Sequence, residues 1–205
     1  MVFGKQTKFA QMNSRELILN SITLRKPTLS LLPEVPLFER NDVDLVAHFK
    51  EMLQLAGGHA IEWAEDFDLM ACIFDIYPDA KTIWSNVGDV KSLRIKPESI
   101  TDSHLLQDVD MAIIKGEIGV AENAAIWIGR SSISHRVLPF ITQHLVVLLD
   151  KTKLVWNMHQ AYQQPELTNL DGFGVFISGP SKTADIEQSL VIGAHGSRSL
   201  TVFLV

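Results

Sequence analysis

The chain has 205 residues, of which 46% are hydrophobic and 20% are charged. This length and composition predict one globular domain, or one domain with an appendage, around a sizeable core. The formal net charge is −6 and the basic residues are scattered, which argues against a nucleic-acid-binding protein. The single cysteine, Cys72, excludes an intrachain disulfide framework and a four-cysteine iron–sulfur cluster held by this chain alone.

Two apolar runs indicate the reactivity of the cysteine thiol and the location of the protein in the cell. Cys72 lies within the apolar run 69–74, which predicts a buried, unreactive thiol. The apolar run 145–149 is far too short to span a bilayer, and no targeting segment is recognised. We therefore expect a cytoplasmic protein with no membrane span.

The first 40 residues are predicted to form an arm. Asn13-Ser-Arg-Glu16 has the pattern of a capping box and predicts a helix that continues to about Lys26. Three prolines interrupt residues 27–40, so this stretch is expected to be an extended linker. The predicted domains are therefore the arm, 1–40, and a core, 41–205.

Strand-like and helix-like segments alternate through the core. Asn41 is the expected N-cap of a helix over 42–56, which Gly57 and Gly58 end. Further helices are predicted over residues 67–77, 102–107 and 152–163. Strands are predicted over residues 60–63, 81–84, 109–115, 124–128, 145–149 and 175–178. This alternation predicts an α/β fold with a mostly parallel central sheet.

The last thirty residues contain the most specific pattern of the chain. A strand over 175–178 enters the turn Gly179-Pro180-Ser181, and we expect a helix after it, then a loop 193–196 and a terminal strand. Backbone amides at a helix start favour anions, because they lack partners within the helix. The predicted anion-binding residues are therefore Ser178, Gly179, Pro180, Ser181, Lys182, Thr183, Asp185 and Gly196. An ordinary helix start without a ligand is the alternative reading.

Two further residues are candidates for catalysis. Segment 116–124 follows a predicted strand, and a strand-end glutamate in such a glycine-containing loop can face a cleft; Glu122 is the candidate. His195, between Gly193 and Gly196, suits a general base or a ligand contact. For both residues the alternative is a structural role in the loop. The histidines have no metal-binding spacing, so no metal site is predicted.

The C-terminal pattern resembles one known family. Ile177-Ser-Gly-Pro-Ser-Lys-Thr-Ala-Asp-Ile-Glu187, followed by Leu190-Val-Ile-Gly-Ala-His-Gly196, is similar to the signature of the LUD domain family, which includes lactate utilisation protein C. Ala121-Glu122 and Leu138-Pro139 with 144–149 extend the likeness to about residues 41–205. Asn123-Ala124 stands where the family usually has Thr-Gly, and Ser197 replaces a proline.

The resemblance implies a fold and a set of functions. The implied fold is a three-layer α/β/α arrangement, as in the superfamily of ribose isomerase, glucosamine-phosphate deaminase and CoA transferase, whose members bind ligands at strand carboxyl ends. The implied function is a component of a system that oxidises L-lactate to pyruvate. In that role this chain carries no cofactor, an iron–sulfur cluster lies on a partner subunit, and the cleft near Ser178–Asp185, Glu122 and His195 binds a small anionic metabolite.

Two other classes of function remain open on the same residues. One is a free-standing enzyme acting on a CoA thioester or a phosphorylated metabolite, in which Glu122 forms a covalent adduct as in some CoA transferases. The other is a binding module that senses a carboxylate and controls other proteins. Whether the chain is an enzyme is left undecided by the sequence.

Overall fold

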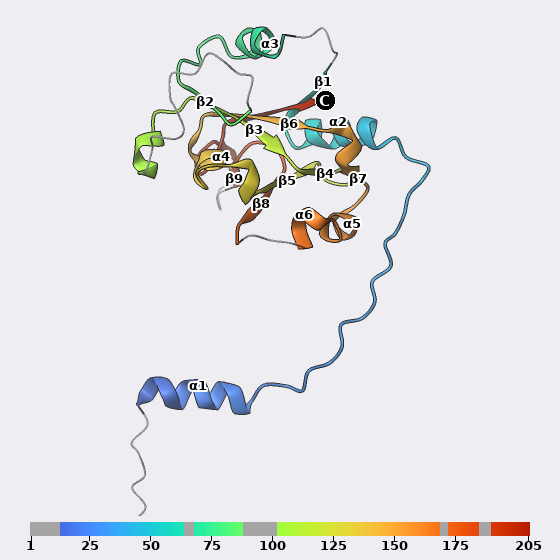
Figure 1. Ribbon diagram of the computed structural model, residues 1–205, viewed down its shortest axis with the longest axis vertical. Coiled ribbons are helices and arrows are strands. Elements are labelled where there is room, and N and C mark those ends of the chain that lie inside the picture. The colour runs from blue at the N-terminus through green and yellow to red at the C-terminus, as the bar shows by residue number, and fades with distance from the viewer. Residues whose placement is uncertain (1–12, 64–67, 88–101, 169–171, 185–189) are drawn as a thin grey trace, which may run out of the picture. The chain divides into compact units, whose positions relative to one another are not determined.

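A computed structural model describes residues 13–63, 68–87, 102–168, 172–184 and 190–205 (Figure 1). By its internal contacts the chain divides into two units, one ending at Pro36 and one spanning Leu37–Val205. Among the residues just given, no helix is long and apolar enough to cross a membrane.

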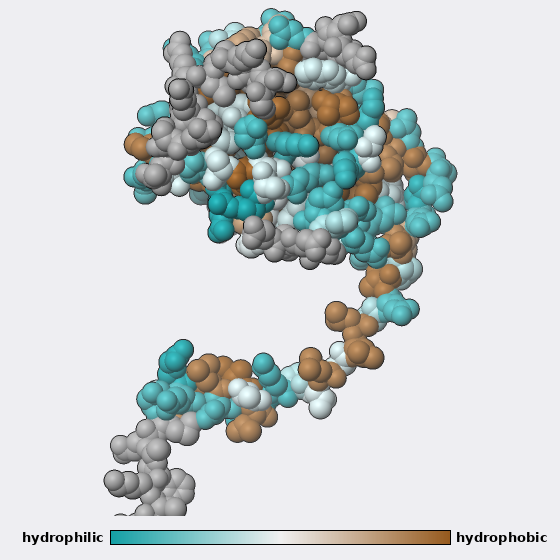
Figure 2. Space-filling view, in the orientation of Figure 1, coloured by the Kyte–Doolittle hydropathy of each residue, from teal (hydrophilic) through white to brown (hydrophobic). Residues whose placement is uncertain are grey.

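The described part of the first unit consists of one helix and an extended segment. Helix α1 spans Ser14–Leu24 and begins at the predicted capping box: Glu16 N donates to Asn13 Oδ1 at 2.9 Å, and Asn13 N donates to Glu16 Oε2 at 3.1 Å. The predicted helix is thus confirmed. No residue of α1 is buried, and Figure 2 shows apolar side chains exposed along this unit.

The second unit is built on a parallel sheet with the strand order β1-β11-β6-β3-β2. Every neighbouring pair in this sheet is parallel, which confirms the predicted mostly parallel central sheet. Its strands are β1 His59–Glu62, β11 Ser199–Leu204, β6 His144–Leu149, β3 Met111–Gly116 and β2 Ile83–Ser85. Five strand predictions that rested on short apolar runs are confirmed to within a few residues.

A second sheet of four strands, in the order β7-β4-β5-β8, lies beside the parallel one. Strands β4 and β7 are parallel, whereas β5 is antiparallel to both β4 and β8. The strands are β7 Leu154–Val155, β4 Ile118–Val120, β5 Ala125–Gly129 and β8 Gly174–Ile177. Sequence patterns indicated β5 and β8 but not that they form a separate sheet with β4.

Helices cover both faces of the parallel sheet. Helix α2, Leu45–Leu55, inserts Phe49 and Leu53 into a core that also contains Leu145 and Val147 of β6. Helix α3, Leu69–Ile76, packs on the other face, where Ile73 meets Val146. This alternation along β6 follows from the two-residue period of a strand. The arrangement is a mixed α/β fold consistent with the predicted three-layer α/β/α class.

Short helices complete the unit. Helices α5, Met158–Tyr162, and α6, Pro165–Thr168, cover the second sheet through Ala161 and Leu167 (Figure 1). Helix α4 spans Leu138–Ile141, and the 3₁₀ turns are η2 Ser103–Leu106, η3 Arg130–Ser132 and η4 Lys151–Lys153. The prediction of a short helix near 102–107 corresponds to η2.

Two helix predictions are wrong. Residues 152–163 do not form one helix, because Leu154–Val155 pair with β4 and only Met158–Tyr162 are α-helical. The helix expected after Ser181 is also absent from the described residues: Lys182–Ala184 form β9, which pairs antiparallel with β10, Leu190–Ile192. Residues 185–189 of that prediction lie outside the described residues. In both cases strand pairing overrides the local helical pattern, with the distant β4 in the first case and with the nearby β10 in the second.

Cys72 is half-buried on α3, against the core that contains Ile73. Burial, and then the charge of Asp75, raise the pKa of its thiol above the ordinary value. The thiol is therefore protonated near neutral pH, as the apolar sequence context indicated.

Candidate functional site

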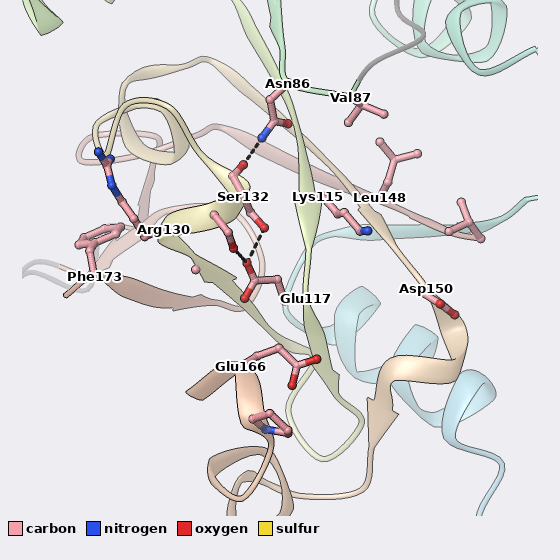
Figure 3. Close-up of a pocket in the computed structure, with 14 residues that line it drawn as sticks. Asn86, Val87, Lys115, Glu117, Arg130, Ser132, Leu148, Asp150, Glu166 and Phe173 are labelled. Carbon is pink, nitrogen blue, oxygen red and sulfur yellow. Dashed lines mark hydrogen bonds between the residues drawn. The ribbon is translucent and has the colours of Figure 1, made fainter. Parts of the chain in front are cut away.

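A cavity of about 950 Å³ opens at the carboxyl edge of the parallel sheet (Figure 3). Four of its lining residues each directly follow a strand of that sheet: Asn86 after β2, Glu117 after β3, Asp150 after β6 and Val205 after β11. The other lining residues are Val87, Lys115, Gly129, Arg130, Ser131, Ser132, Leu148, Pro165, Glu166 and Phe173. Its volume is within the range of small-molecule sites, and this edge is where open α/β sheets bind ligands.

Glu117 is the most precisely held polar group of the cavity. Its backbone N–H donates to Trp127 O at 2.9 Å, which ties the end of β3 to β5. The hydroxyls of Ser131 and Ser132 both donate to Glu117 Oε1, the latter at 2.7 Å. Within the described residues, Oε2 has no hydrogen-bond donor. One carboxylate oxygen is thus fixed by the protein, and the other is available to a ligand.

The turn η3 presents the two serines because it is anchored from β2. Asn86 Nδ2 donates a hydrogen bond to Ser132 O, which joins the end of β2 to η3 (Figure 3). Gly129 precedes this turn, and a Cβ at Gly129 would lie only 2.6 Å from Glu117 Oε2. A glycine is therefore required for the carboxylate to occupy its place.

The remaining charges of the cavity are distributed around Glu117. Hydrogen bonds from Thr152, whose hydroxyl lies 2.6 Å from Oδ1, lower the pKa of Asp150, and the charges of Lys153 and Lys115 act in the same direction. A backbone hydrogen bond at Glu166 and an ion pair with Lys153 at 3.0 Å lower the pKa of Glu166. Within the described chain, Glu166 Oε2 is buried and has no hydrogen-bond partner. Asp150 and Glu166 are therefore ionised near neutral pH.

The predicted anion-binding segment lies at the opposite edge of the parallel sheet. Ser181 N donates to Ser197 O at 2.8 Å, and Gly193 N donates to Ser181 O at 2.9 Å. Ser197 precedes β11, and Arg198 N donates to Gln143 O just before β6, so these residues stand at the amino ends of the strands. Of the predicted anion-binding residues that the structure describes, none lines the large cavity.

Several of these residues pack against the end of α2. Gly179 has a φ of +78°, and a Cβ there would lie 2.6 Å from Ala56 O, so only glycine suits this approach. Pro180 is buried, and a Cβ at Gly57 would lie 3.3 Å from Lys182 Nζ. Lys182 and Thr183 belong to β9, and Asp185 lies outside the described residues. The helix amides that motivated an anion site are not present at Ser181–Ala184.

His195 and Gly196 line a separate, shallower hollow. Its volume is about 420 Å³, and it is formed with α4 and residues 142–143, again at the amino edge of the sheet. The side chain of His195 is exposed. The structure therefore does not bring His195 together with Glu122 or with the large cavity.

Glu122 has a structural contact at the beginning of α5. Its Oε2 accepts a hydrogen bond from Met158 N at 3.2 Å, and its backbone N–H donates to Trp156 O at 2.9 Å. Ser178 Oγ donates to Asn123 O at 2.6 Å. Ser178 and the loop that carries Glu122, two parts of the predicted cleft, are therefore in contact. Ala124 adopts a φ of +54°, a conformation that glycine favours. The catalytic role of Glu122 stays a prediction.

Of the two glutamates that follow β3, Glu117 lines the cavity and the predicted candidate Glu122 does not. Glu117 follows the buried strand immediately, whereas residues 118–120 continue as β4 and carry Glu122 away. The sequence signal that indicates Glu117 is its position, because it is the first residue after the end of β3. Nothing in the local sequence around Ser131 and Ser132 indicates their contact with Glu117, which lies fourteen and fifteen positions earlier in the chain.

Comparison with known proteins identifies the family. The LUD domain model matches residues 95–205, more than half of the chain, so this chain belongs to the LUD domain family. Among curated relatives, lactate utilization protein C of Geobacillus sp. is 29% identical over 180 residues, which cover 82% of this chain and 70% of that protein. The lactate utilization protein C of Shouchella clausii is 34% identical over 42% of this chain and 40% of that protein.

The extent of these matches varies. The lactate utilization protein C of Exiguobacterium sp. is 32% identical over 54% of this chain and 49% of its own length. The chain thus spans about half or less of the length of several curated relatives that it matches. The structure of a DUF162 family protein from Deinococcus radiodurans superposes on 78% of this chain and 96% of that protein, with a TM-score of 0.61. The sequence identity is 14%, so the match establishes a shared fold.

Proposed function

We propose that this chain is a component of an L-lactate utilisation system, in which it binds a small anion or assists assembly. The observation that carries the proposal is the shared naming of its relatives, several of which are lactate utilization protein C. Membership of the LUD domain family and the cavity at the carboxyl edge of the sheet support it. The ligand-binding part of the role belongs to this cavity.

Oxidation of lactate to pyruvate releases two electrons, and we place their carrier on a partner subunit with an iron–sulfur cluster. The one cysteine of this chain is too few for a four-cysteine cluster. Within the described residues, no group of three or more histidine, cysteine or acidic side chains is arranged to hold a metal ion. The location of this complex is expected to be the cytoplasm.

A growth experiment tests the role in lactate use. Deletion of the gene should abolish growth of the native host on L-lactate and leave growth on pyruvate unchanged, because pyruvate lies beyond the oxidation step. Restoring the gene on a plasmid should restore growth on lactate. Equal growth of the deletion strain on both acids would refute the proposed role.

A copurification experiment tests the partner. A tagged chain isolated from lactate-grown cells should carry an iron–sulfur subunit, detected by iron and sulfide analysis and by peptide sequencing. The eluate from pyruvate-grown cells is the matched control. A solitary chain that converts a CoA thioester, with a hydroxylamine-trappable adduct on Glu122, would favour the free-standing enzyme instead.

A further inference from the structure

The geometry points to the cavity at the carboxyl edge, and not to residues 178–196, as the binding site for a 2-hydroxy monocarboxylate. In this site Lys115 pairs with the ligand carboxylate, and Glu117 Oε2 accepts a hydrogen bond from the ligand hydroxyl. The choice of ligand class rests on the proposed function, whereas the choice of site rests on the contacts described above.

Glu117 is arranged to accept one further hydrogen bond. Ser131 and Ser132 occupy Oε1, and the absence of a side chain at Gly129 leaves room for Oε2. A carboxylate held at one oxygen loses little conformational entropy when the other oxygen binds a ligand, so its hydrogen bond contributes more to affinity. A ligand that offers a hydroxyl donor therefore gains over one that does not.

Lys115 provides the charge for the ligand carboxylate. It is the one exposed residue of strand β3, two positions before Glu117, and both residues line the same cavity. In the part of the chain that the structure describes, Lys115 has no ion pair within 4.0 Å, unlike Lys153, which is paired with Glu166. Arg130, the other lining cation, donates a hydrogen bond to Ser134 O at 3.4 Å, so we assign the ligand carboxylate to Lys115, which lies two positions from Glu117.

The other charges disfavour a ligand with more than one negative charge. Asp150 and Glu166 both line the cavity and are ionised, and although Lys153 pairs with Glu166, Glu117 adds a third carboxyl group beside the two lining cations Lys115 and Arg130. Like charges in one site repel, so a phosphate dianion or a CoA ester is disfavoured relative to a monocarboxylate. The volume of about 950 Å³ exceeds that of a three-carbon acid, which would occupy only the polar wall.

Calorimetric titration of the full chain with L-lactate, propionate and phosphate tests the inference. Propionate has the same carbon chain but lacks the hydroxyl, so wild-type protein should bind lactate more tightly than propionate and phosphate more weakly than either. Lys115→Met should weaken binding of both acids about tenfold or more, because a charge-assisted hydrogen bond is lost. Glu117→Gln should reduce the preference for lactate over propionate by about tenfold, since it removes the charged acceptor.

Matched substitutions outside the cavity locate the site. Glu122→Gln and Lys182→Met make the same chemical changes outside the cavity, and Glu51→Gln does so on the exposed surface of α2. Affinity lost in the Glu122 or Lys182 variants but kept in the Glu117 and Lys115 variants would overturn the inference. Circular dichroism melting of each variant verifies folding, and if Glu117→Gln fails to fold, Lys115→Met, whose residue is exposed, keeps the test decisive.

The outcomes also separate this inference from the proposed function. Wild-type protein should release or absorb heat when titrated with L-lactate to about 20 mM, which is well above the dissociation constant of a weak, millimolar complex. The absence of any heat of binding would refute the ligand site. Loss of growth on lactate in the deletion strain would still support the role in lactate utilisation in that case. Tight lactate binding together with normal growth of the deletion strain would support the site and refute the role.

Discussion

Gly129 and Gly174 are register partners at the end of the β5–β8 pair, and each leaves room for a different neighbour. A Cβ on Gly129 would lie 2.6 Å from Glu117 Oε2, at the end of a flexible side chain. A Cβ on Gly174 would lie 1.9 Å from Trp127 Cζ2, part of a rigid ring that is 6% exposed. The two glycines therefore serve the site and the core respectively.

Gly129→Ala should impair ligand binding more than stability. The Glu117 carboxylate can swing away from the new methyl group, at the cost of its two hydrogen bonds from the serines, so we expect a loss of about 1–2 kcal/mol in unfolding free energy. Lactate affinity should fall to the level of the Glu117→Gln variant. Urea denaturation and calorimetry measure the two effects, and unchanged affinity would contradict the assigned position of Glu117.

Gly174→Ala should reduce stability more than ligand binding. The tryptophan ring cannot move without repacking the core of the second sheet, so the unfolding free energy should fall by about 1–3 kcal/mol or more. Thermal unfolding measures this change, and Gly172→Ala is not a suitable control because Gly172 has a φ of +77°. A melting temperature equal to that of wild-type protein would show that Trp127 is not packed against this strand.

His144 should make stability depend on pH. Burial, and then the charge of Arg198, lower the pKa of His144 below its ordinary value of 6.5, although Asp110 acts in the opposite direction. Its Nδ1 lies 2.8 Å from Ser199 Oγ, which donates to Tyr77 Oη at 3.0 Å. Between the lowered pKa and 6.5 the unfolded chain binds more protons, so stability should fall as pH decreases through this window and be fully present above it.

Urea midpoints measured from pH 7.5 downward test this pH dependence. His144→Gln should reduce the change in midpoint within that window, because the titrating group is removed. Ser199→Ala is the control: it removes the hydrogen bond but keeps the imidazole, so it should lower stability at every pH and retain the dependence. An identical slope in wild-type and His144→Gln proteins would contradict the prediction.

The beginning of α2 offers a test of a capping residue. Asp44 Oδ1 accepts hydrogen bonds from Val46 N at 3.0 Å and Ala47 N at 3.1 Å, so the helix is capped at Asp44 and not at the predicted Asn41. Asp44→Ala should cost about 1 kcal/mol of unfolding free energy, and Asn41→Ala only a few tenths. Equal losses in the two variants, measured by urea denaturation, would be inconsistent with this cap.

The sequence by itself determined the local elements whose signals lie within a few residues. The capping box at Asn13 and Glu16 forms as expected, because both partners belong to the same helical turn. Runs of buried aliphatic residues identified β3, β6 and β11, because a strand covered on both faces needs continuous apolar side chains. The C-terminal pattern also identified the LUD domain family.

The tertiary structure alone decided which residues meet. Lys182–Ala184 form a strand because they pair with Leu190–Ile192. Leu154–Val155 form a strand, despite a helical sequence pattern, because they pair with β4. The cavity arose because parallel strands far apart in the chain end at one edge, where Glu117 meets Ser131 and Ser132. Such contacts depend on strand order and register, which no short stretch of sequence encodes.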